Sequence, residues 1–227
     1  MSTRLHTAPL QRLPCTLGLA GDAGPGGMDV AERFGLWLGT LDAIGLRAAL
    51  ESLQAPRPAR ASAGPRSGAP ALAEDLQRVQ GAARAAIARD VDLDLGREPD
   101  GRPGFSPWRQ RHLELQRLIA PMVEGLRDHV RQALARSSPR LARLAALDAA
   151  LAPVVGRREQ ALWPTLATLL ERRFLQLRRE ADGDAWLDDF GREWRQALTL
   201  ELELRLAPVA GLVEAFYSQD NDESHKG

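Results

Sequence analysis

The sequence is poor in two residues that often carry chemistry, cysteine and lysine. Cys15 is the only cysteine, so no internal disulfide can form, and a reducing compartment fits this usage. Lys226 is the only lysine, and the other 29 basic residues are arginines. Arginine binds carboxylates through two parallel hydrogen bonds, which lysine cannot do, so this bias matters for ion pairing.

Long apolar runs are also missing. No stretch approaches the roughly 20 apolar residues of a membrane-spanning helix. Near the N-terminus, Leu13–Ala20 is weakly apolar, but Pro14, Cys15 and Thr16 interrupt it, and this makes a poor signal-peptide core. We therefore expect a cytoplasmic protein without a transmembrane segment.

Aromatic residues make up only 5% of the chain, and leucine, alanine and arginine dominate it. These are helix-forming residues, and apolar positions recur at helical spacing. Ser106-Pro107 and Ser138-Pro139 are typical helix starts. We predict an all-α fold: an elongated helical hairpin or bundle with coiled-coil-like packing and a smaller N-terminal helical pair. The predicted division is a flexible segment 1–27, a helix 28–53, a disordered Pro/Ala/Gly/Arg linker 54–70, a helix and acidic loop 71–104, a long-helix bundle 105–217 and a disordered tail 218–227.

Near-heptad spacing after Pro139 predicts a helical seam through Leu166, Leu169, Arg173 and Leu177, in which the arginine is a flaw. Pro121 should kink its helix without ending it. Pro153 and Pro164 should bend or break the next one.

No catalytic, cofactor-binding or metal-binding constellation emerges. The acidic loop at Asp90 has Leu95 and Gly101 where a calcium loop needs glycine and glutamate. His112 and His129 lack the preceding carboxylate of a di-iron motif, so we expect them at helix surfaces or boundaries. The glycines near the N-terminus lack the Lys-Ser/Thr of a phosphate loop. We predict a protein that is not an enzyme.

The zero net charge conceals an uneven distribution. Residues 106–181 carry 14 arginines against seven acidic residues, whereas residues 182–227 carry four basic against 11 acidic residues. The basic stretch either pairs with the acidic last helix, which includes a Glu201–Arg205 ion pair, or binds an anionic partner. The candidate partner-binding residues are Arg157, Arg158, Trp163, Arg172, Arg173, Arg178 and Arg179.

Four segments carry a family resemblance: FGLWLGTLD from Phe34, SPRLARLAALD from Ser138, LERRF from Leu170 and LELRLAPVAGL from Leu202. With them the chain resembles an uncharacterised proteobacterial domain-of-unknown-function family of all-helical proteins, which has no assigned activity or site residues. The resemblance implies genes near stator-like and OmpA-like membrane proteins, and hence an accessory role in an envelope complex.

Together these observations favour a non-enzymatic helical protein that binds a protein partner, such as the cytoplasmic part of a membrane complex. The alternative is a self-associating coiled-coil protein, for example a homodimer. Nucleic-acid binding is less favoured, because no motif for it is present and aromatic residues are not interleaved with the arginine doublets.

Overall fold

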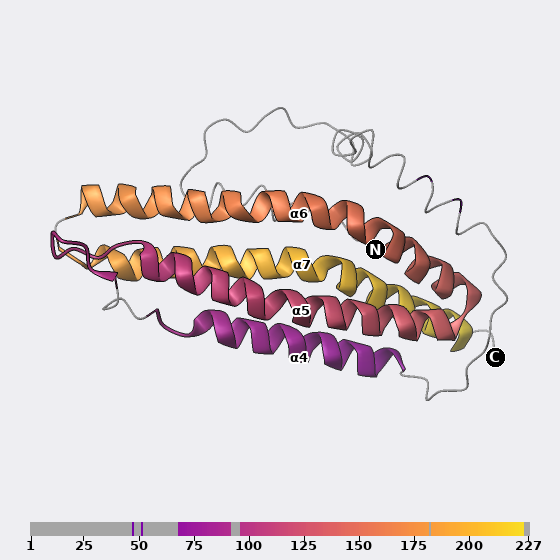
Figure 1. The fold of residues 1–227 in the computed structure, drawn as a ribbon. Helices are drawn as coiled ribbons and strands as arrows, with labels where there is room; N and C mark the ends of the chain where they lie inside the picture. The colour runs from indigo at the N-terminus through magenta and orange to yellow at the C-terminus, as the bar shows by residue number, and fades with distance from the viewer. Residues whose placement is uncertain (1–46, 48–50, 52–67, 92–95, 182, 225–227) are drawn as a thin grey trace, which may run out of the picture. The chain divides into compact units, whose positions relative to one another are not determined.

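The described part of the chain is helical. The computed structural model describes residues 47, 51, 68–91, 96–181 and 183–224, without the side chains of 69, 154–155, 157–163 and 220–224. Within these residues lie helices α4 (Ala69–Ala88), α5 (Ser106–Ser137), α6 (Pro139–Glu180) and α7 (Trp186–Ser224) (Figure 1). The described residues contain no strand, only an isolated bridge between Arg97 and Pro103. The all-α prediction is confirmed.

The helix starts predicted from sequence agree with the structure. Helix α5 begins at Ser106, and the Ser138 hydroxyl accepts a hydrogen bond from the Leu141 N–H at the start of α6 (3.2 Å). A bend or a break was expected at Pro153 and Pro164, and the break does not occur, because α6 runs unbroken past both prolines. Helix α7 likewise continues through Pro208 to Ser224, so it includes the first residues of the segment expected to be a disordered tail.

Three segments of the prediction lie wholly or mostly outside the described residues: the flexible segment 1–27, the helix 28–53 and the linker 54–70. The division of the chain into domains stays a prediction. None of the helices in the described residues is both long and apolar enough to cross a membrane.

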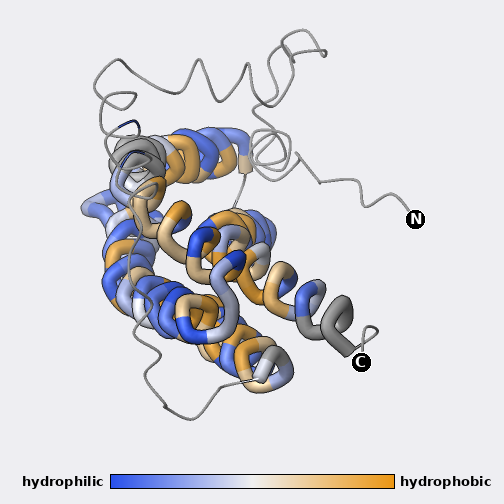
Figure 2. Tube along the Cα trace, turned by 90° about the vertical axis from the view of Figure 1, so that its right-hand side faces the viewer, coloured by the Kyte–Doolittle hydropathy of each residue, from blue (hydrophilic) through white to orange (hydrophobic). Residues whose placement is uncertain are grey.

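The chain forms two compact units. Of the described residues, the first unit contains Leu76–Gly125 and Leu162–Ala207, and the second contains Leu126–Ala161, residues 208–224 and the start of α4 up to Asp75. In each unit, helix segments distant in sequence lie side by side (Figure 1). Hydrophobic and hydrophilic residues alternate along each helix, as expected when one face of a helix is buried (Figure 2).

Aromatic side chains form the core of the first unit. The Phe174 ring lies 4.8 Å from that of Trp186 and 5.1 Å from that of Phe190 between ring centroids. Trp108 contacts Phe190 and Trp194 at 5.0 and 5.3 Å, with tilted or edge-on geometries that aromatic pairs prefer. With Phe105, these residues join α5, α6 and α7, and we call them the aromatic cluster. Its members are Phe105, Trp108, Phe174, Trp186, Phe190 and Trp194.

The buried stripe of α6 in this unit differs from the predicted seam. Leu166, Leu170 and Phe174 are buried, so the stripe repeats every four residues. The predicted seam assigned Leu169 and Arg173 instead, one residue too early. Arg173 therefore lies beside the core, where its side chain is only partly buried.

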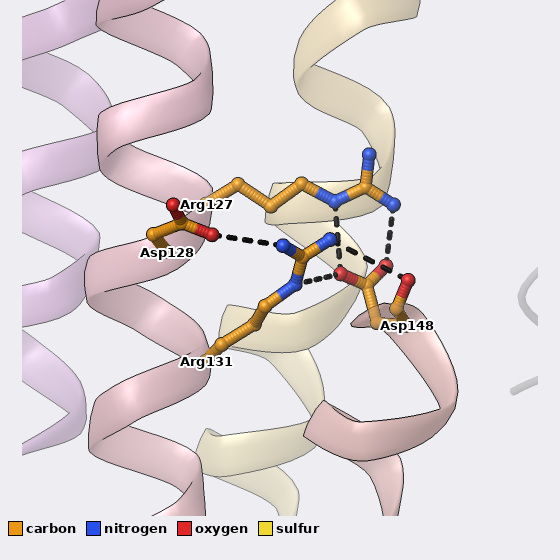
Figure 3. Close-up of polar contacts among 4 residues, drawn as sticks. All are labelled: Arg127, Asp128, Arg131 and Asp148. Carbon is orange, nitrogen blue, oxygen red and sulfur yellow. Dashed lines mark hydrogen bonds and ion pairs between the residues drawn. The ribbon is translucent and has the colours of Figure 1, made fainter. Parts of the chain in front are cut away.

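The second unit has a charged cluster where α5 and α6 meet. Arg127 donates two hydrogen bonds to the Asp148 carboxylate (2.8 and 2.6 Å), and Arg131 donates a third from Nε (2.6 Å) (Figure 3). Arg131 also pairs with the exposed Asp128. Burial raises the pKa of Asp148, but the hydrogen bonds and charges of both arginines outweigh it and hold that pKa below its ordinary value. This cluster joins two helices that are separated in sequence only by Ser138.

Replacing Phe174 with alanine should reveal how much the aromatic cluster contributes. Phe174 is fully buried, so we expect Phe174→Ala to lower the free energy of unfolding by about 3–5 kcal/mol. Its neighbour Leu175 is 42% exposed, and Leu175→Ala should change that free energy by no more than about 0.5 kcal/mol. Urea unfolding followed by circular dichroism measures both, and equal effects of the two variants would contradict the assigned core.

The Asp148 cluster generates a second prediction. Asp148→Asn leaves two partly buried guanidinium groups without their carboxylate, and we expect a loss of about 2–3 kcal/mol at neutral pH. Because the folded-state pKa of Asp148 is lowered, its stabilising effect is present above the unfolded pKa and is lost as pH falls through the folded pKa. The difference between wild type and variant should therefore shrink in acid. Asp128→Asn, at an exposed member of the cluster, is the matched control and should have little effect.

Candidate partner-binding site

A bridged turn before α5 forms one wall of the candidate site. The Glu98 N–H donates to the Arg102 carbonyl (2.9 Å), and the Gly101 N–H donates to the Glu98 carbonyl (2.8 Å). Gly101 has a φ of 75°, a left-handed conformation that glycine adopts without steric cost. The turn therefore holds Glu98 and Asp100 close together at its tip.

Two glycines close the base of this turn. The Gly104 N–H donates to the Gly96 carbonyl (2.8 Å). A Cβ atom on Gly104 would lie 2.7 Å from that carbonyl oxygen, closer than real Cβ contacts allow. Only glycine at this position permits the close approach of the two backbone segments.

The turn and the C-terminal end of α6 are joined by one arginine from each of the two segments. Arg178 on α6 pairs with Glu98 (2.8 Å) and Asp100 (2.5 Å), and its side chain is 11% exposed. In return, Arg102 of the turn donates to the Arg178 carbonyl (2.5 Å) and more weakly to that of Ala181 (3.4 Å). The Arg178 carbonyl belongs to the last turn of α6 and Ala181 directly follows the helix. Carbonyls at a helix C-terminus lack helical partners, so a cation there is favourable.

Asp100 stays ionised in this arrangement. The hydrogen bond from the Arg102 N–H (2.9 Å) is the main cause that lowers the pKa of Asp100, and Arg178 adds to it. The carboxylate therefore remains a counter-ion of Arg178 at neutral pH.

A surface hollow of about 590 Å³ lies between the turn and the end of α6. We call it the arginine hollow. Its lining has four cationic side chains and one carboxylate, with one leucine and one glutamine: Asp100, Arg102, Arg172, Leu175, Gln176, Arg178 and Arg179. Anionic groups are the ligands that such a lining attracts.

Two of these arginines remain available for a ligand. Arg172 is exposed and has no ion pair or hydrogen bond within the described residues. Arg179 is also exposed, and the only partner described for it is the Leu175 carbonyl of its own helix (3.2 Å). Between them, Leu175 is one of the few large apolar side chains exposed in the described part.

The structure separates the residues that the sequence grouped as candidates. Arg172, Arg178 and Arg179 line the hollow, whereas Arg173 points elsewhere and binds Glu193 of α7 through two hydrogen bonds (2.9 and 2.8 Å). The hydrogen bonds with Glu193 raise the pKa of Arg173. The role of Arg172, Arg173, Arg178 and Arg179 in partner binding stays a prediction. The side chains of Arg157, Arg158 and Trp163 lie outside the described part of the chain.

The intrachain pairing of basic and acidic segments is thus partial. Arg173 pairs with the acidic last helix as one alternative predicted, but Arg178 pairs with the turn before α5. The sequence did not predict the hollow, because nothing in the spacing places residues 98–102 beside residues 172–179.

A second polar cluster is buried in the first unit, and the expectation for its histidine is wrong. His112 was expected at a helix surface or boundary, yet it is 2% exposed. It follows the buried Trp108 by four residues and precedes the buried Leu115 by three, so helical periodicity could have placed it on the buried face. His129, in contrast, has a side chain that is 49% exposed, as expected.

Glu201 of α7 is the acceptor in this cluster. His112 Nε2 lies 3.2 Å from Glu201 Oε2, and Gln116 donates to Oε1 at 3.3 Å. Arg205 donates to the same Oε1 at 2.7 Å, which confirms the predicted Glu201–Arg205 pair. Burial raises the pKa of Glu201, but the hydrogen bond with His112 and the charge and hydrogen bond of Arg205 lower it more.

We assign the buried cluster a structural role, because His112 and Glu201 are closed off from solvent and their polar atoms bind one another. Among the described residues, no group of three or more histidine, cysteine, aspartate or glutamate side chains could hold a metal ion. The arginine hollow is therefore the stronger candidate for a ligand.

The comparisons with known proteins place the chain in a family. It belongs to the family described as "Protein of unknown function (DUF3348)", whose model matches residues 1–218. No curated protein and no solved structure matches the chain.

The buried cluster generates a prediction about acid stability. Glu201→Gln removes the carboxylate that Arg205 and His112 share, and we expect a loss of about 2–4 kcal/mol at pH 7. The lowered pKa of Glu201 means that its stabilising effect exists above the unfolded pKa and is lost as pH falls through the folded pKa. Wild type should therefore lose its advantage over the variant in acid.

Glu203→Gln is the matched control for that experiment. Glu203 lies two residues away on α7 and pairs with Arg84, but both side chains are more than 40% exposed. Exposed pairs contribute about 0–1 kcal/mol, so this variant should unfold nearly as wild type does. Urea titrations at several pH values compare the three proteins, and a pH-independent loss for Glu201→Gln would contradict the assignment.

Proposed function

We propose that this protein is a non-enzymatic helical accessory protein that binds an acidic protein partner through the arginine hollow. The observation that carries the proposal is the pair of exposed arginines without an acidic partner, Arg172 and Arg179, on either side of exposed Leu175. Arginine beside apolar surface is typical of protein interfaces, where desolvated arginines contribute strongly to binding.

The charge distribution supports an acidic partner. The chain supplies carboxylates for Arg173 and Arg178, but among the described residues it supplies none for Arg172 or Arg179. The resemblance noted from the sequence suggests a membrane complex similar to a flagellar stator as the source of that partner, with the protein acting in the cytoplasm.

Charge reversal on α6 tests the proposal. The tagged full-length chain is used to recover bound proteins from the native cell, in wild-type form and as Arg172→Glu/Arg179→Glu. We expect proteins held by the wild type to be lost from this variant, because two attractive contacts become repulsive. Arg140→Glu/Arg143→Glu is the matched control, because it changes two other exposed arginines of α6 by the same charge.

The proposal fails if the three baits recover the same proteins. It also fails if the lost protein is the chain itself. In that case, light scattering would show a wild-type oligomer that the Arg172→Glu/Arg179→Glu variant dissociates, and the self-associating alternative would hold.

A further inference from the structure

The exposed face at the end of α6 has a definite chemical order. Arg172, Leu175 and Arg179 follow one another at spacings of three and four, so they lie on one face of the helix. At 1.5 Å per residue, the two arginines are about 10 Å apart along the axis, with the leucine between them. This face presents a cation, an apolar side chain and a second cation in a row.

The other charged groups in and beside the hollow already have partners within the chain. Glu98 and Asp100 already bind Arg178, and Arg102 is engaged by carbonyls of the last turn of α6. Gln176 donates to Glu180 (3.0 Å). Arg172 and Arg179 are therefore the groups that a ligand would contact first, and they call for two negative charges.

We propose that the ligand of this face is an acidic helical segment of a protein, with two carboxylates about two turns apart and an apolar side chain between them. This inference rests on the proposed function and specifies the chemistry of the partner. Carboxylates with that spacing face Arg172 and Arg179 together, and the apolar side chain covers Leu175, which is 42% exposed.

The exposed Leu175 favours an acidic peptide as the ligand over inorganic phosphate or nucleic acid. An inorganic phosphate or a nucleic-acid backbone would neutralise the arginines but leave the leucine in water. The lining also has no aromatic side chain on which a base could stack. A peptide covers both the charged and the apolar parts of the face, and burial of apolar surface adds to the affinity.

Defined peptides test this inference on the full-length protein. The first probe is an alanine-rich helical peptide with two glutamates spaced as Arg172 and Arg179 are and a leucine between them. In a second peptide glutamine replaces the leucine, and in a third glutamine replaces both glutamates. Binding is measured by titration into the ¹⁵N-labelled chain, with the amide resonances of residues 172–179 as the readout.

We expect the first peptide to shift those resonances and to bind roughly fivefold more tightly than the second. Arg172→Gln/Arg179→Gln should weaken its binding roughly five- to tenfold, in line with two partly exposed ion pairs. Leu175→Ala should bind the first and second peptides equally, because the apolar contact is gone. The unchanged spectrum outside the hollow shows that each variant is folded.

Several results would overturn the inference: no shifts with the first peptide, equal affinity of the wild type for the first two peptides, or unchanged affinity in the double variant. Displacement of the first peptide by equimolar inorganic phosphate or oligothymidylate would identify a phosphate ligand instead. If the peptides fail but charge reversal still releases a partner, only the chemistry assigned to that partner is wrong. If both fail, the proposed function is wrong as well.

Discussion

The aromatic cluster is the constraint on which the rest of the first unit depends. The chain has few aromatic residues, yet six of them meet in this unit and contribute side chains from α5, α6 and α7. Because Phe174 is fixed in this core, the rotation of α6 about its axis is fixed too. Leu175 must then face solvent, Arg173 lies at the flank where Glu193 reaches it, and Arg178, four residues after Phe174, meets the turn at Glu98.

The buried cluster around Glu201 adds specificity to a core that aromatic packing alone leaves adaptable. Apolar contacts are non-directional, so a helix can shift against its neighbours at modest cost. The Glu201 carboxylate bound by His112 and Gln116 of α5 favours one register of α7 against α5, because a shift would separate it from these two partners while Arg205 moves with it. The same pairing, with the lowered pKa of Glu201, makes this register sensitive to acid.

Sequence periodicity predicted the helices better than it predicted their contacts. Serine-proline pairs located the starts of α5 and α6, since capping is a local property of the chain. The α6 seam was displaced by one residue because spacings of three and four fit several stripes, and only the partner helix decides among them. His112 was missed because a polar side chain does not count as apolar, although its position fits the buried face. The hollow itself depends on a contact between segments more than 70 residues apart, which no local pattern contains.

The arginine bias of the chain acquires a structural meaning at the end of α6. Arg173 binds the Glu193 carboxylate through two parallel hydrogen bonds that a lysine could not reproduce, Arg178 binds the two carboxylates of Glu98 and Asp100, and Arg102 holds carbonyls of the same helix end. Among the described residues, carboxylates therefore neutralise Arg173 and Arg178 but not Arg172 or Arg179. The described contacts do not show that the unpaired guanidinium groups of Arg172 and Arg179, or the exposed Leu175 beside them, stabilise this unit. The proposed binding of an acidic partner is the hypothesis that links these two arginines with the exposed leucine between them.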